Sequence, residues 1–248
     1  MNSENAISRL HKIIETAYEE GSKYEARNMS FKNTWIKVFN LESTDVPSLL
    51  SSFSLLFELL RKSRSIIESH PRLNTQKNLG YLERIEESLY HIDINNGDME
   101  HFYNHIDLET ITALYYIGEN VSFVNEFKLK EIESEVIDSL LIEIEELTKK
   151  FTSSTLPEKL KLIVFKQLNL IREALTQYTI TGIDGLQGAL EQTIGSIILN
   201  GSEFSNQEND QNVKGLFGFI NKLGNILSVG NTAGEFIGYI KEYLPLSK

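Results

Sequence analysis

Three histidines are the side chains in this sequence best suited to metal-ion chemistry. His101 and His105 are four positions apart, a spacing that puts two imidazoles on one face of a helix, where both can reach one metal ion. His91, Asp93 or Asp107 could supply a third ligand. However, no glutamate stands between His101 and His105 to act as the general base of an H-E-x-x-H motif. We therefore expect the three histidines to be surface or capping residues, and we expect no metal or cofactor.

Two arginine–histidine pairs, Arg64 with His70 and Arg84 with His91, form a second candidate site. Their spacing resembles that of helical ribonucleases of the HEPN superfamily, in which an arginine and a histidine a few residues apart lie in a composite site at a dimer interface. The resemblance implies RNA cleavage, with Arg64 and His70 as the catalytic pair. The alternative is that these cations only offset the carbonyl groups at the end of a helix over residues 47–70.

Other catalytic chemistry has little support in the sequence. There is no G-x-S-x-G elbow and no P-loop, and the glycines of TGIDGLQG (181–188) follow no strand that could make them a phosphate cradle. The absence of cysteine excludes disulfides, zinc–thiolate sites, iron–sulfur clusters and thiol nucleophiles. These observations favour a non-enzymatic protein.

The charge is concentrated in one segment. The chain has 35 acidic and 24 basic residues, and residues 83–146 hold 17 of the acidic and only 3 of the basic ones. Such a segment repels phosphate, so we expect no nucleic-acid partner there and instead a protein partner with a basic surface, bound over residues 119–146. The alternative is a helix face that is only solvated. The candidate interaction residues are Glu131, Glu135, Asp138, Glu143 and Glu146.

The C-terminal residues 213–244 form a second candidate surface. Leu216, Ile220, Leu223 and Leu227 lie on one helical stripe that continues into a ladder of small residues, Gly230, Gly234 and Gly238. Such a ladder lets another helix approach closely, so the stripe could pack on a helix of the same chain, on a second subunit of a homo-oligomer, or on lipid. Polar residues interrupt every apolar window, which disfavours a transmembrane span.

The elements that would position these residues are predicted to be helices. Apolar residues recur at three- and four-residue steps along most of the chain, and convincing alternating strands are absent. Start signals are Thr44 or Asp45 followed by Pro47, then Asn74, and then Asp107. Pro71 should end the helix that contains Pro47 near residue 69. The longest predicted helix covers residues 123–151. The fold class is therefore all-α, a multi-helix bundle with a Gly-rich C-terminal helical module.

Composition suggests four segments. We predict an N-terminal helical domain with an acidic central region (1–152), a helical hairpin (153–200), a flexible polar loop (201–212) and Gly-rich amphipathic helices (213–248). Eleven of the 15 glycines lie between residues 182 and 238. The polar start MNSENAISRL lacks the regions of a secretory signal, so we expect a cytoplasmic protein.

Residues 171–200, IREALTQYTITGIDGLQGALEQTIGSIILN, resemble a helix-turn-helix segment of uncharacterised bacterial proteins from mobile or defence-related loci. This resemblance implies no chemistry. It favours an accessory, regulatory or immunity subunit of a bacterial system such as anti-phage defence. The alternatives are a membrane-active effector that uses residues 213–244, and the HEPN-like ribonuclease.

Overall fold

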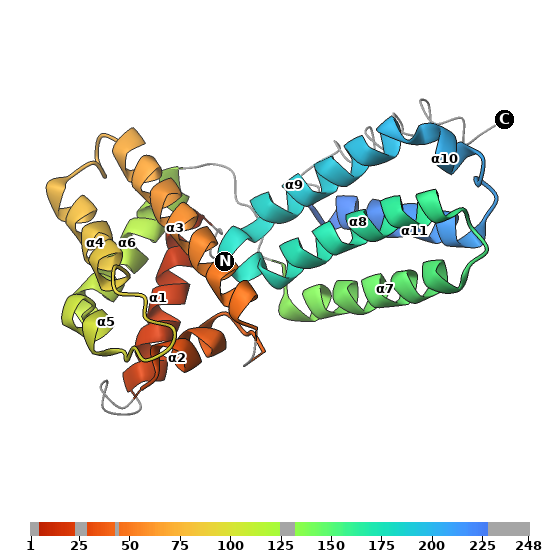
Figure 1. Cartoon of the computed structure of the whole chain (residues 1–248). Coiled ribbons are helices and arrows are strands. Elements are labelled where there is room, and N and C mark those ends of the chain that lie inside the picture. Colours follow the sequence, from red (N-terminus) through yellow and green to blue (C-terminus); the bar gives the residue numbers. More distant parts are fainter. Residues whose placement is uncertain (1–4, 23–28, 43–44, 125–131, 228–248) are drawn as a thin grey trace. The chain divides into compact units, whose positions relative to one another are not determined.

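The all-α prediction is confirmed. The computed structural model describes residues 5–22, 29–42, 45–124 and 132–227, which form eleven helices and no strand (Figure 1). The helices are α1 (Ala6–Ser22), α2 (Phe31–Val38), α3 (Val46–Ser69), α4 (Gln76–Ser88), α5 (Glu100–His105), α6 (Leu108–Val124), α7 (Ser134–Ser153), α8 (Glu158–Thr176), α9 (Tyr178–Leu199), α10 (Gly201–Ser205) and α11 (Gln211–Leu227). None of these helices is long and apolar enough to cross a membrane.

The chain divides into two compact units. The first comprises residues 1–130 with 179–182, and the second comprises 131–178 with 183–248. The boundary therefore lies at residue 130, whereas the composition suggested residue 152. It falls earlier because α7, which carries much of the acidic segment, packs on α8 and α11 of the second unit.

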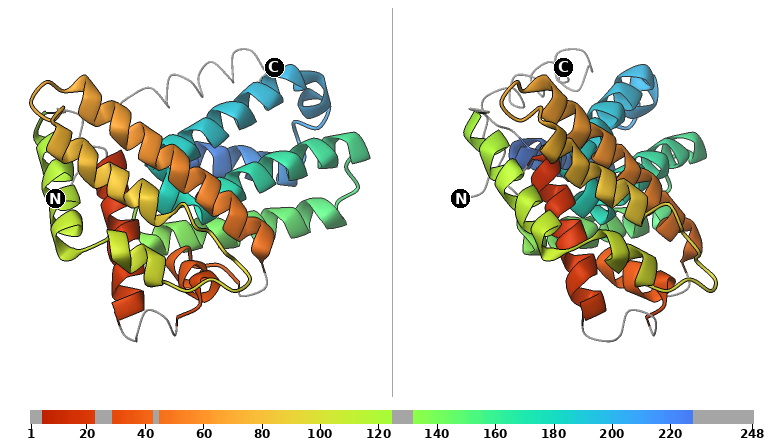
Figure 2. Two further views of the ribbon diagram at one scale, coloured as in Figure 1. Left: turned by 60° about the vertical axis from the view of Figure 1, so that its left-hand side comes forward. Right: turned by 90° about the vertical axis from the view of Figure 1, so that its left-hand side faces the viewer.

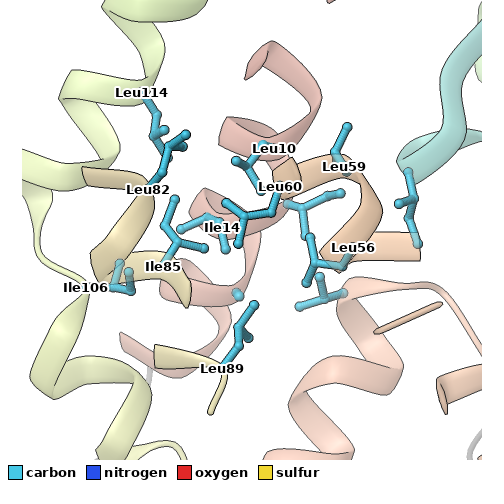
Figure 3. Close-up of a cluster of buried hydrophobic side chains, with 14 of the residues drawn as sticks. Leu10, Ile14, Leu56, Leu59, Leu60, Leu82, Ile85, Leu89, Ile106 and Leu114 are labelled. Carbon is cyan, nitrogen blue, oxygen red and sulfur yellow. The ribbon is translucent and has the colours of Figure 1, made fainter. Parts of the chain in front are cut away.

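The core of the first unit is built around α1. This helix packs on α2, α3 and α6, and α6 lies beside it in both views of Figure 2. Apolar side chains from four helices and two connecting segments meet in the cluster of Figure 3, where the labelled residues are Leu10, Ile14, Leu56, Leu59, Leu60, Leu82, Ile85, Leu89, Ile106 and Leu114. Burying these aliphatic side chains, at roughly 1.5–3 kcal/mol each, holds the unit together.

Local signals set several helix ends as predicted. The Asp45 carboxylate accepts a hydrogen bond from the Ser48 N–H (3.0 Å), and α3 ends at Ser69, two residues before Pro71. The Asp107 carboxylate caps α6 by accepting from the Thr110 N–H (2.7 Å). At α4 the cap is Thr75 and not the predicted Asn74, since the Thr75 hydroxyl accepts from the Asn78 N–H (3.1 Å).

The predicted helix over 123–151 was wrong in its extent. Phe123 belongs to the last turn of α6, and α7 begins only at Ser134, after Glu133 in extended geometry (φ −64°, ψ 144°). Residues 201–212 also differ from the predicted flexible loop. They include the short helix α10, whose Phe204 is fully buried and packs edge-on against Phe217. This one aromatic residue anchors an otherwise polar segment, so the segment is ordered.

The second unit is organised around α7, which packs on α8 and on α11. Its buried face carries Leu140, Ile144, Leu147 and Phe151, spaced at three and four residues. Matching buried stripes are present on α8 and α11. The spacing leaves the opposite face of α7 exposed.

Candidate protein-interaction site

The outer face of α7 combines carboxylates with an exposed isoleucine. Glu135, Asp138, Ile142 and Glu145 follow one another at steps of three and four, so they share one face of the helix. All four are exposed, and Ile142 is 60% exposed. The acidic face predicted from the sequence is therefore present on the described part of the segment, with an apolar residue at its centre. We call these four residues, together with Glu146, the α7 strip.

A hollow of about 310 Å³ adjoins the α7 strip, between α7 and α11. It is lined by Ser139, Ile142, Glu143, Glu146, Leu147, Lys150 and Gly215. Gly215 presents no side chain, and a Cβ added there would lie 3.6 Å from the Leu147 Cδ2 atom. The hollow thus places two apolar side chains, Ile142 and Leu147, beside two carboxylates and the Lys150 ammonium.

The carboxylates differ in how far they are already engaged. Glu143 accepts a hydrogen bond from the Lys222 ammonium (2.7 Å), which ties α7 to α11. Among the described residues, Asp138, Glu145 and Glu146 have no ion-pair partner. Three carboxylates therefore face solvent without a direct ion pair to any described residue, although Lys149 and Lys150 follow one turn after Glu145 and Glu146 on the same helix.

The predicted apolar stripe of the C-terminal region is part of the core. Leu216, Ile220 and Leu223 are buried in the second unit, where α11 packs on α7, and Leu227 is half-buried. Of the three partners considered, another helix of the same chain covers the stripe over residues 213–227. These leucines and the isoleucine are thus not a free surface. Glu131, Gly230, Gly234 and Gly238 lie outside the described residues.

The three histidines do come together, as the spacing predicts for two of them. The ring of His101 lies 4.4 Å from that of His91 and 4.7 Å from that of His105, measured between centroids. His105 Nδ1 is 3.3 Å from a carboxylate oxygen of Glu87, and His101 Nε2 is 2.9 Å from the Glu87 carbonyl oxygen. Nevertheless, no group of three or more carboxylate and imidazole side chains in the described part of the chain is placed to hold a metal ion.

In neither arginine–histidine pair do the arginine and the histidine bond to each other. Arg64 donates to the Glu86 carboxylate (3.1 Å), whereas His70 shares a hydrogen bond with the neighbouring Ser69 hydroxyl (3.1 Å). Arg64 lies on α3, whereas His70 follows the last residue of that helix in extended geometry, and the two side chains have different partners. Arg84 is held by Asp107 (3.3 Å) and Thr110 (3.2 Å), away from the histidine cluster that contains His91.

Sequence analysis missed one feature of the first unit, a cleft of about 710 Å³ between α4 and α6. Its walls include Arg72, Lys77, Tyr81, Leu108 and Tyr116. The run Tyr115-Tyr116-Ile117 is the one local signal for it. Three consecutive residues of a helix cannot all point into the core of the domain, so the run predicts an exposed aromatic side chain.

The chain matches no protein-family model, no curated protein and no solved structure.

Proposed function

We propose that this protein is a non-enzymatic binding subunit that docks a basic protein partner on the α7 strip. The observation that carries the proposal is Ile142, a large apolar side chain 60% exposed among carboxylates without ion-pair partners in the described part of the chain. Acidic residues alone are typical of a solvated helix face, and the exposed isoleucine among them adds apolar surface that the methylene stem of a basic side chain can cover.

The chemistry of the strip suits lysine or arginine of a partner. Such a side chain can lay its methylene stem on Ile142 and Leu147 at the hollow and place its charge near Glu146. Arginine can also bind a carboxylate with two hydrogen bonds at once. Because the hollow is partly shielded from solvent, an ion pair there is worth more than one on an open surface.

An accessory, regulatory or immunity role in a bacterial system is consistent with this mode of action. Such subunits act by occupying a surface of another protein and need no reacting groups of their own. The likeness of residues 171–200 to proteins of mobile and defence-related loci supports anti-phage defence as the setting.

The experiment compares two double variants, each of which replaces two carboxylates with neutral amides. Asp138→Asn/Glu146→Gln removes two charges from the α7 strip, and Glu191→Gln/Glu208→Gln removes two charges elsewhere in the second unit. Tagged full-length proteins are isolated from the cells that naturally produce them, and the bound basic protein is quantified. We expect recovery to fall about tenfold for the strip variant and to stay unchanged for the control, since two ion pairs with the partner are lost only in the first.

Equal recovery with both variants would show that the α7 strip does not bind the partner. A third variant, Ile142→Ala, isolates the apolar contribution. It should weaken binding at every salt concentration, whereas the effect of neutralising the carboxylates should shrink at high salt.

A further inference from the structure

Helix α6 is apolar on two faces. Ile111, Leu114, Ile117 and Val121 are buried against the first unit. On the outer face Leu108, Tyr116 and Phe123 are exposed to 66, 61 and 83%, along a ridge that also contains Thr112 and Asn120. Water contact on so many large apolar side chains of one helix is typical of an interface that lacks its partner.

The ridge forms one wall of the cleft between α4 and α6. These helices run antiparallel, since the Tyr81 hydroxyl donates to Glu109 (2.7 Å) and Arg84 is bonded to Asp107, one turn further along α4. Consequently the first turn of α4, with Lys77, and the preceding Arg72 lie towards the Asn120 end of the cleft. The cleft is polarised, with Arg72 at one end and Glu109 at the other, and the Lys77 ammonium lies between them near the Tyr81 hydroxyl that Glu109 accepts.

The two cations are without carboxylate partners in the described ranges. The Lys77 ammonium lies 5.9 Å from the centroid of the Tyr81 ring, and neither Lys77 nor Arg72 forms an ion pair there. Glu109 accepts the Tyr81 hydroxyl with one oxygen, and a carboxylate can accept further hydrogen bonds.

We propose that this surface binds a second copy of the same chain, with the ridges of two α6 helices packed antiparallel across a two-fold axis midway between Thr112 and Tyr116. An isologous contact requires a self-complementary surface. Antiparallel packing about that position sets the large Tyr116 of each copy against the small Thr112 of the other copy. It also brings the partner's Glu109 to the Asn120 end, where Arg72 lies.

Charge complementarity selects a second copy over an unrelated protein as the occupant. The antiparallel arrangement pairs the positive end of each cleft with the negative end of the other, so both sets of charges are matched by one operation. Because the contact centres on a single helix from each copy, it belongs with small interfaces, and we expect dissociation constants in the micromolar range.

The test is sedimentation velocity of the full-length chain over concentrations up to about 0.5 mM. We expect a monomer–dimer equilibrium that Tyr116→Glu weakens at least tenfold. Tyr90→Glu is the matched control, because Tyr90 is equally exposed in the same unit (68%) but does not line the cleft. A chain that stays monomeric throughout, or a dimer that Tyr116→Glu leaves intact, would overturn the proposal.

A charge swap tests the antiparallel geometry itself. Arg72→Glu/Lys77→Glu and Glu109→Lys should each abolish self-association, because each homodimer then opposes like charges twice. Mixing the two variants should restore dimers, since both contacts of the mixed dimer again join opposite charges. Circular dichroism of each variant alone establishes that it is folded, and folded variants that fail to associate on mixing would contradict the antiparallel arrangement.

Discussion

The Nε–H of Arg9 donates a hydrogen bond to the carbonyl oxygen of Ile180, 3.2 Å away and 171 positions later in the chain. Arg9 is almost fully buried, and Ile180 belongs to the core of the first unit. The bond therefore fastens residues 179–182 to a unit that otherwise ends at residue 130. Two residues further on, Gly182 takes φ 62° and ψ −158°, a conformation that is essentially restricted to glycine.

The glycine at this point should be indispensable. In Gly182→Ala the new Cβ would collide with the Arg9 guanidinium group, and the backbone would be strained by about 1–3 kcal/mol. We expect the free energy of unfolding to fall by at least that amount. Unfolding is measured by the fluorescence of Trp35, which is buried in the same unit.

Gly80→Ala is the control for this substitution. Gly80 is inside α4, and a Cβ added there would have no other atom within 4 Å, so alanine should stabilise by about 0.5–1 kcal/mol. Equal effects of the two substitutions would refute the role of Gly182.

Buried and exposed leucines of the second unit should differ sharply. Leu223 is fully buried on α11, so Leu223→Ala should lower the free energy of unfolding by roughly 2–5 kcal/mol through lost burial and a cavity. Leu199 at the end of α9 is 87% exposed, and Leu199→Ala should change the free energy of unfolding by about 0.5 kcal/mol or less. Urea titrations followed by circular dichroism measure both. If Leu223→Ala changed the free energy of unfolding as little as Leu199→Ala does, the α11 stripe would not be part of the core.

Acidification should destabilise the first unit through His11. Burial lowers the pKa of His11 below its ordinary value of 6.5, although Glu15, 3.7 Å away, acts in the opposite direction. The unfolded chain then binds the proton more readily than the folded chain does. The stabilisation is complete above pH 6.5 and is lost as the pH falls through the lowered pKa of the folded state.

Urea unfolding at a series of pH values between about 7.5 and 5 measures this effect. We expect the free energy of unfolding of the wild type to fall over that range and the slope to be shallower in His11→Gln. Parallel curves for the two proteins would exclude His11 as the titrating group.

Patterns of residues close in the sequence predicted the fold class and several helix ends. Pro47, Pro71 and Asp107 act within one helical turn, so their effects can be read from neighbouring residues. The end of α6 and the unit boundary could not be predicted in this way. They depend on packing between segments far apart in the chain, of which the bond from Arg9 to Ile180 is one example.

The candidate site was predictable in part for the same reason. Of the predicted interaction residues, Glu135, Asp138 and Glu146 share an exposed face, whereas Glu143 is half-buried and paired with Lys222. Whether Ile142 is exposed depends on which side of α7 meets α8 and α11. The cleft between α4 and α6 likewise requires two helices to be placed together, and no local pattern contains that information.

Site-specific photo-crosslinking in the cells that naturally produce the protein tests the central claim most directly. A photoreactive amino acid replaces Ser139, which lines the hollow beside the α7 strip, and in a control it replaces the exposed Gln187 of α9. We predict a discrete adduct with a basic protein from position 139 only, which disappears when Asp138→Asn/Glu146→Gln is added. The same adducts from both positions, or an adduct at 139 that survives neutralisation of the strip, would contradict the account.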